Sequence, residues 1–96
     1  MSFSFHPDAE KEFNDAIDYY EGLEPGLGYD FALEINSAVK RSITFPKAWL
    51  EIEEGIRRSL VRRFPYGVLY SEAKNGIFII AVMNLHRKPG YWKSRK

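Results

Sequence analysis

Apolar residues recur at helical spacing in the first half of the chain and at strand-like spacing in the second half. Phe3 and Phe5 lie on one side of an alternating segment, which predicts a short strand over residues 2–6. Pro7 suits the first turn of a helix, where its missing N–H costs nothing, and Gly22 predicts where that helix ends. The apolar stripe of this helix comprises Ala9, Phe13, Ala16, Ile17 and Tyr20.

A second helix is predicted from about Gly28 to Thr44, after turn-forming residues at 24–26. Its apolar stripe comprises Ala32, Ile35, Val39 and Ile43. Pro46 cannot continue the helix and ends it. Two helices joined by a short turn form a helical hairpin.

The spacing of apolar residues changes to that of strands in the second half of the chain. Residues 47–55 predict an irregular link, residues 56–64 an arginine-rich strand, and residues 65–67 a tight corner. Another strand follows over residues 68–73. Asn75-Gly76 is a strong hairpin signal, because both residues tolerate the positive φ angles of a type I′ turn.

The strand predicted over residues 77–85 is apolar on both faces, so we expect it to be central and covered on both sides. The helical hairpin covers one face. The face with Phe78, Ile80 and Val82 is covered by a partner, by the C-terminal tail or by neighbouring side chains. The order β-α-α-β-β-β, with helices on one face, indicates an α+β fold in a single domain over residues 1–96.

Composition and charge narrow the classes of function. The chain has no cysteine and two histidines, which exclude thiol chemistry and argue against a metal centre, and nothing predicts a cofactor. No apolar run reaches the roughly 18 residues that span a bilayer, and no signal peptide is visible, so we expect a cytoplasmic protein without membrane contact. Residues 1–46 hold three Lys/Arg and nine Asp/Glu, whereas residues 47–96 hold eleven and four. The basic half suits an anionic partner, unless the two halves simply attract each other.

Three segments together resemble the RelE/ParE toxin superfamily, whose members are often called plasmid stabilisation proteins. They are the acidic helical hairpin behind a short strand, the run R-R-F-P-Y-G-V-L-Y at residues 62–70, and the run A-V-M-N-L-H-R-K-P-G-Y-W at residues 81–92. The resemblance spans nearly the whole chain.

The resemblance implies a twisted antiparallel sheet with the helical hairpin on one face. It also implies the toxin of a type II toxin–antitoxin pair, which arrests growth when free and is neutralised by a cognate antitoxin. That antitoxin would cover Phe78, Ile80 and Val82, and operator DNA would be contacted only through it. ParE-like members inhibit DNA gyrase by binding, whereas RelE-like members cleave mRNA on the ribosome.

Cleavage of RNA needs a proton acceptor, cations for the phosphorane charge and a proton donor. The candidates for these roles are Arg62, His86, Arg87 and Tyr91. For a toxin that binds its target, the candidate contact residues are Arg58, Arg62, Arg87, Tyr91 and Trp92. Adjacent arginines such as Arg62 and Arg63 point to opposite faces of a regular strand, so each pair supplies one to a given face.

Two departures from the RelE-like pattern favour the ParE-like branch. Positions where RelE-like enzymes carry catalytic arginines hold Gly67 and Leu85 here, whereas Arg87 and Tyr91 match that pattern. Relatives often carry histidine where this chain has Asn84, and His86 is a candidate substitute. The leading hypothesis is therefore a gyrase-binding toxin without a catalytic residue. A ribosome-dependent mRNA endonuclease and an inactive paralogue that only binds an antitoxin are the alternatives.

Overall fold

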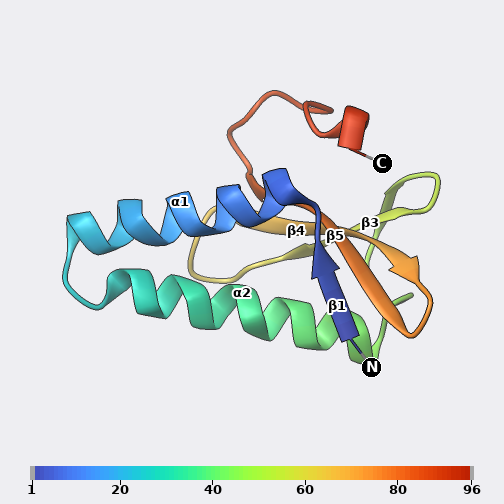
Figure 1. The fold of residues 1–96 in the computed structure, drawn as a ribbon, viewed down its shortest axis with the longest axis horizontal. Coiled ribbons are helices and arrows are strands. Elements are labelled where there is room, and N and C mark those ends of the chain that lie inside the picture. The colour runs from blue at the N-terminus through green and yellow to red at the C-terminus, as the bar shows by residue number, and fades with distance from the viewer. Residues whose placement is uncertain (1, 96) are drawn as a thin grey trace.

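A computed structural model describes residues 2–95 and shows two helices packed against a five-stranded sheet (Figure 1). The strand order across the sheet is β1-β5-β4-β3-β2. The elements along the chain are β1 (Ser2–Phe5), α1 (Pro7–Leu23), α2 (Leu27–Thr44), β2 (Glu51–Glu53), β3 (Ile56–Leu60), β4 (Tyr66–Ala73), β5 (Gly76–Asn84) and the short 3-10 helix η1 (Lys93–Arg95).

The sheet is mixed, which corrects the prediction of an antiparallel one. β1 runs parallel to β5, while the β2–β3, β3–β4 and β4–β5 pairs are antiparallel. The segment that joins β1 to β5 includes both helices and three strands, so no tight hairpin fixes their relative direction. The link predicted as irregular contains the three-residue edge strand β2, and β3 ends at Leu60 rather than at residue 64.

The turns differ in position from the sequence prediction. The corner lies at residues 61–65, and the predicted corner residues Tyr66 and Gly67 already belong to β4. The β4–β5 hairpin is confirmed, but its turn is Lys74-Asn75, where Asn75 has a φ of 65°. Gly76 is the first residue of β5. A glycine is required there because a Cβ atom would collide with the backbone of Ser2 in β1.

The helical hairpin has the predicted boundaries to within a residue or so, with specific polar groups at both helix starts. Pro7 opens α1, and His6 Nδ1 accepts the Asp8 N–H at 3.0 Å. The Glu21 carboxylate accepts the N–H groups of Gly26 and Gly28 at the start of α2. These bonds satisfy backbone donors that have no partner within a helix.

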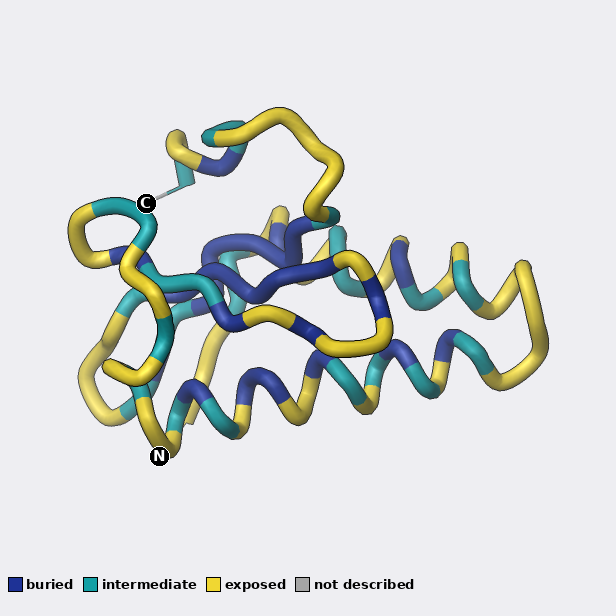
Figure 2. Tube along the Cα trace, turned by 180° about the vertical axis from the view of Figure 1, so that it is seen from behind, coloured by how far each residue is buried: buried dark blue, intermediate teal, exposed yellow. Residues whose placement is uncertain are grey.

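Each face of the sheet has its own apolar cluster. The larger cluster lies between the sheet and the helices and includes Phe31, Ile35, Val39, Tyr70 and Ile79. The smaller lies on the opposite face and comprises Ile56, Leu69, Ile80, Ala81, Met83 and Trp92. Trp92 belongs to the C-terminal tail, residues 85–95, so the tail covers this second face. Figure 2 shows the buried strands between these two covers.

A bulge in β5 changes which residues share a face. Leu69 pairs with Ala81 and Tyr70 with Ile79, so Ile80 is an extra residue in β5. Phe78 and Ile80 therefore face the tail, whereas Val82 faces the helices. The prediction that Phe78, Ile80 and Val82 lie on one face is wrong, because a regular two-residue alternation does not continue through the bulge.

Candidate functional site

The edge of β5 is open beyond the end of β1. β1 pairs with β5 only from Gly76 to Ile79, so backbone groups further along β5 lack a strand partner on that side. The Val82 N–H donates to Glu12 Oε1 at 3.0 Å, and Arg95 donates to the Ile80 carbonyl at 3.3 Å. One helix residue and one tail residue thus take over the role of the missing strand.

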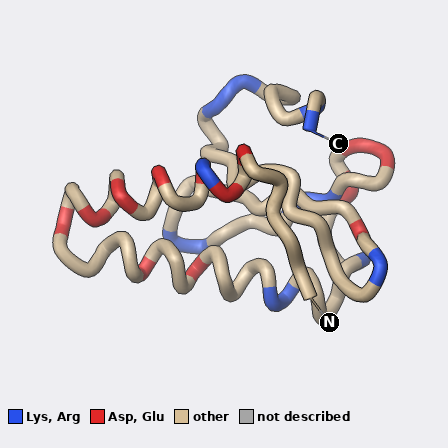
Figure 3. The backbone as a smooth tube through the Cα atoms, viewed as in Figure 1, with Lys and Arg blue, Asp and Glu red and all other residues tan. Residues whose placement is uncertain are grey.

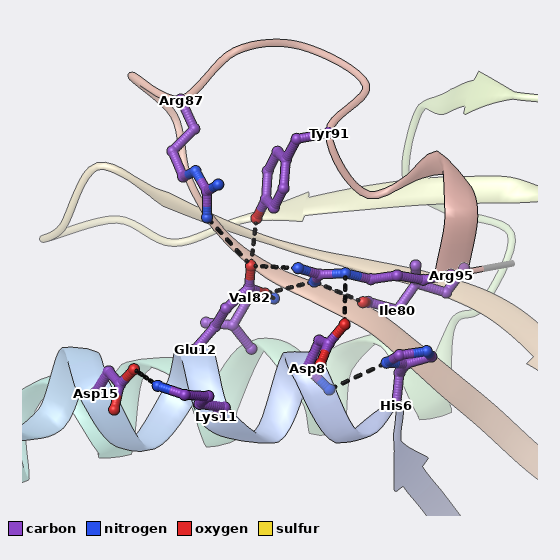
Figure 4. A network of polar contacts seen from close by, with 10 residues as sticks. All are labelled: His6, Asp8, Lys11, Glu12, Asp15, Ile80, Val82, Arg87, Tyr91 and Arg95. Carbon is purple, nitrogen blue, oxygen red and sulfur yellow. Dashed lines mark hydrogen bonds and ion pairs between the residues drawn. The ribbon is translucent and has the colours of Figure 1, made fainter.

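Glu12 joins helix α1, strand β5 and the tail. Its side chain is 15% exposed and accepts two hydrogen bonds from the Arg95 guanidinium, at 2.9 and 3.0 Å. The Tyr91 hydroxyl donates to it at 2.8 Å, and the Arg87 guanidinium lies 3.6 Å away. Figure 4 shows these side chains converging on the carboxylate. We call Glu12, Arg87, Tyr91 and Arg95 the Glu12 cluster.

The contacts of the Glu12 cluster raise the pKa of two of its members, Tyr91 and Arg95. Burial, followed by the hydrogen bond to Glu12, raises the pKa of Tyr91 well above its ordinary value. The hydrogen bond to Glu12 likewise raises the pKa of Arg95. At neutral pH Tyr91 therefore keeps its proton and donates it to a carboxylate. This geometry suits a structural tie or a binding surface and not a general base.

Arg87 is the most accessible member of the Glu12 cluster. Its guanidinium carbon lies 3.8 Å from the centre of the Tyr91 ring, and its side chain is 53% exposed. It borders a shallow open cleft whose other lining residues are Glu12, Asp15, Ala16, Tyr19, Tyr66, Val82 and Asn84. Stacking holds the guanidinium in place while part of it stays available to an external carboxylate or phosphate.

The structure divides the predicted target-contact residues into three places. Arg87 and Tyr91 lie together in the Glu12 cluster. Arg58 and Trp92 line a second cleft, between the tail and strands β2 and β3. Arg62 lies apart from both, exposed in the corner at residues 61–65.

Neither histidine belongs to the Glu12 cluster. His86 is exposed in the turn after β5, where its backbone N–H donates to Asn84 Oδ1 at 2.9 Å. His6 serves as the N-terminal cap of α1. Among residues 2–95, neither the Arg62 nor the His86 side chain forms a polar contact with Arg87 or Tyr91, so the four nuclease candidates are not assembled into one site.

Sequence reasoning missed Glu12 and Arg95. The sequence did contain a signal for Glu12. Glu12 lies three residues after Ala9 and four before Ala16, on the apolar side of the predicted helix, and a carboxylate in an apolar environment needs a polar partner. Arg95 gave no such signal, since only folding brings residues 12 and 95 together.

The acidic and basic halves meet in the folded molecule. Figure 3 shows acidic residues along the helices and basic residues along the tail. Arg63 pairs with Asp30 of α2 at 3.3 Å, and Arg87 and Arg95 pair with acids of α1. Arg57 donates to the Trp49 carbonyl at 2.7 Å and pairs with Glu51, in its own half of the chain, at 3.3 Å. Part of the charge asymmetry is therefore used in ion pairs within the molecule, in line with the second interpretation of that asymmetry.

Among residues 2–95, no three His, Asp or Glu side chains come together as a metal site would require. Within the same residues, neither helix is long and apolar enough to cross a bilayer.

Comparisons with known proteins bear on the fold. No protein-family model matches this sequence, and a search of curated proteins found no match. A solved structure described as the chromosomal ParDE TA system from P. aeruginosa is similar, with a TM-score of 0.75 and 19% sequence identity. The match covers 90% of this chain and 97% of the other. The two N-terminal helices on a five-stranded mixed sheet therefore form an α+β, RelE/ParE-like fold.

Proposed function

We propose that this chain is the toxin of a type II toxin–antitoxin pair and arrests growth by binding its target. The fold likeness to the ParDE TA system supports the toxin assignment. The observation that favours binding over catalysis is the state of Tyr91, whose hydroxyl proton is donated to Glu12 and whose pKa is raised. A group in that state neither accepts a proton at neutral pH nor stands free to give one up.

DNA gyrase is the target that we favour, in the cytoplasm, with a cognate antitoxin as the neutralising partner. The sequence departures at Gly67 and Leu85 favour the ParE-like branch. In the structure Gly67 is buried under the side chain of Arg58, and Leu85 is 37% exposed. Arg87 offers a fixed, half-exposed guanidinium for an acidic or phosphate group of the target.

A ribosome-dependent mRNA endonuclease is the second candidate. The adjacency of Arg87 and Tyr91, with 3.8 Å between guanidinium and ring, favours it, because both residues match the RelE-like pattern. In that case substrate binding would have to detach Tyr91 from Glu12. An inactive paralogue that retains only antitoxin binding is the third.

Induced expression in a growing culture separates these functions. We expect growth arrest, inhibition of supercoiling by purified gyrase in the presence of the purified chain, and intact mRNA in primer extension. New 5′ ends within translated codons would identify the endonuclease instead. If the culture continues to grow although folded protein is expressed, the chain is an inactive paralogue.

Arg87→Ala tests the site directly. We expect weaker growth arrest from a variant that remains folded, because the guanidinium is more than half exposed and its ion pair with Glu12 is long. Lys74→Ala, at the exposed tip of the β4–β5 hairpin, is the matched control and should remain fully toxic. Equal toxicity of both folded variants would remove Arg87 from the site.

Antitoxin binding at Phe78, Ile80 and Val82 remains a prediction. Ile80 and Val82 are 1% and 2% exposed, so an antitoxin segment would reach them only by displacing the tail or the helices. Phe78 is partly buried and more accessible. Hydrogen exchange of β5 in the free chain and in the complex measures this, and unchanged protection of residues 77–85 would refute the assignment.

A further inference from the structure

A second cleft lies between the C-terminal tail and strands β2 and β3, on the sheet face away from the helices. Its lining residues include Ile52, Glu53, Arg58, Met83, Trp92 and Lys93. Met83 and Ile52 belong to the apolar cluster under the tail, so the cleft has an apolar floor with charged groups around it.

Arg58 crosses this face through space left by a glycine. A Cβ atom added to Gly67 would lie 3.1 Å from Arg58 Cγ and 3.3 Å from Cδ, closer than side chains normally pack. Gly67 thus lets the stem of Arg58 lie flat on β4, and it accounts for a partly buried arginine beside the cleft.

Charge within the cleft is unbalanced. Lys93 Nζ lies 3.4 Å from Glu53 Oε1, so these two charges compensate each other. Within residues 2–95 the Arg58 guanidinium has neither a hydrogen bond nor an ion pair. One positive charge beside an apolar floor is left without a partner, and one carboxylate would supply two parallel hydrogen bonds to it.

The surroundings of Arg58 suit a protein ligand better than a nucleic acid. Recognition of unpaired bases relies on exposed aromatic faces. Trp92 is 4% exposed, and Arg87 already covers the Tyr91 ring at 3.8 Å. A protein segment needs only an apolar contact and a counter-charge, and this cleft has both.

We propose that this cleft binds an extended segment of a partner protein in which a carboxylate side chain lies near an apolar one. The carboxylate pairs with Arg58, and the apolar side chain rests on Met83 and Ile52. The site is separate from the Glu12 cluster. It does not depend on growth arrest, so the purified chain tests it whatever its cellular target.

Short synthetic peptides are the probe. Three acetylated peptides would carry leucine and glutamate separated by one, two or three serines, with amidated C-termini, and a matched set would carry glutamine in place of glutamate. Two-dimensional amide spectra of isotope-labelled protein report binding through Gly67, Met83 and Lys93. We expect saturable shifts with a Kd on the order of 1 mM for at least one glutamate peptide, and at least about tenfold weaker binding of its glutamine counterpart.

Variants at Arg58 decide whether the guanidinium is responsible. Arg58→Gln should remove the preference for glutamate, Arg58→Lys should keep part of it, and Gly67→Ala should weaken it by displacing the arginine stem. Lys74→Gln is the control, because Lys74 is an exposed cation at the tip of the β4–β5 hairpin, outside the cleft. If Arg58→Gln does not fold, Arg58→Lys and Gly67→Ala carry the test.

Three results would overturn the proposal. They are equal affinity for the glutamate and glutamine peptides, unchanged binding by the folded Arg58 variants, and the absence of saturable shifts with every peptide up to about 20 mM. Saturation of the same amides by a single-stranded RNA oligomer at lower concentration would also overturn it, in favour of a nucleic-acid site.

Discussion

The two faces of the sheet are covered in different ways. On the helix face, large side chains interlock, and the Phe31 ring lies 4.8 to 6.2 Å from the rings of Phe13, Tyr20, Phe64 and Tyr66. On the tail face, the apolar cluster is smaller, and the Glu12 cluster supplies directional bonds that hold the tail.

This difference separates stability from function. Apolar burial is non-directional and tolerates no water, so the helix face should open only on global unfolding. Hydrogen bonds and ion pairs can be exchanged for bonds to a ligand at little net cost. The tail, which carries Arg87, and the sheet face beneath it, which carries Arg58, are therefore the parts that can rearrange when a partner binds. Changes on each face should reveal this contrast.

The largest effect is expected from Phe31→Ala on the helix face. Phe31 is fully buried among aromatic rings, so its truncation should lower the free energy of unfolding by about 3–5 kcal/mol. Urea denaturation measures this, with Leu33→Ala on the exposed side of the same helix as the control. A loss below about 1.5 kcal/mol would mean that the helix face is not the main source of stability.

Glu12→Gln, in α1, should have the next largest effect, through the attachment of the tail. Removal of one charge from a mostly buried pair leaves Arg95 with only its longer ion pair, at 3.7 Å, to the exposed Asp8, and we expect a loss of about 2–3 kcal/mol. Hydrogen exchange at the Val82 amide should accelerate more than exchange in the helices. Glu10→Gln, exposed on the same helix, should change neither quantity. Uniform acceleration throughout the sheet would contradict a locally held tail.

Tyr91→Phe should alter the dependence of stability on pH. Because the folded state raises the Tyr91 pKa, its contribution is fully present below the ordinary tyrosine pKa of about 10 and is lost as pH rises toward the folded value. The variant keeps the ring but not the proton, so its stability should fall less steeply above about pH 10. Tyr29→Phe, an exposed tyrosine, should follow the wild type. Identical alkaline slopes for both variants would exclude this role for Tyr91.

The smallest effect is expected from Arg63→Gln, which removes an ion pair near the tip of the helical hairpin. Both partners are about half exposed, at 55% and 43%, so solvent screens the attraction. We expect a change in unfolding free energy of about 0–0.5 kcal/mol that vanishes in high salt. A loss above about 1 kcal/mol would contradict the expectation that solvent screens this surface pair.

The sequence by itself determined the element types and most of the boundaries. The spacing of apolar residues and the capping signals both act over a few residues. Such local preferences account for the helix start at Pro7, the apolar stripes of both helices and the turn at Asn75. The same local reasoning led to errors where a contact from a distant segment intervened. Gly76 was interpreted as a turn residue, whereas the approach of Ser2 requires a glycine there.

Only the tertiary structure decided the direction of β1, the bulge at Ile80 and the members of the candidate sites. A two-residue period cannot reveal an inserted residue, so Val82 was assigned to the wrong face. The contact between Glu12 and Arg95 joins residues 83 positions apart in the chain, and the contact between Arg58 and Gly67 joins two neighbouring strands. Such pairings depend on how strands and tail pack in three dimensions, and no spacing along one segment encodes them.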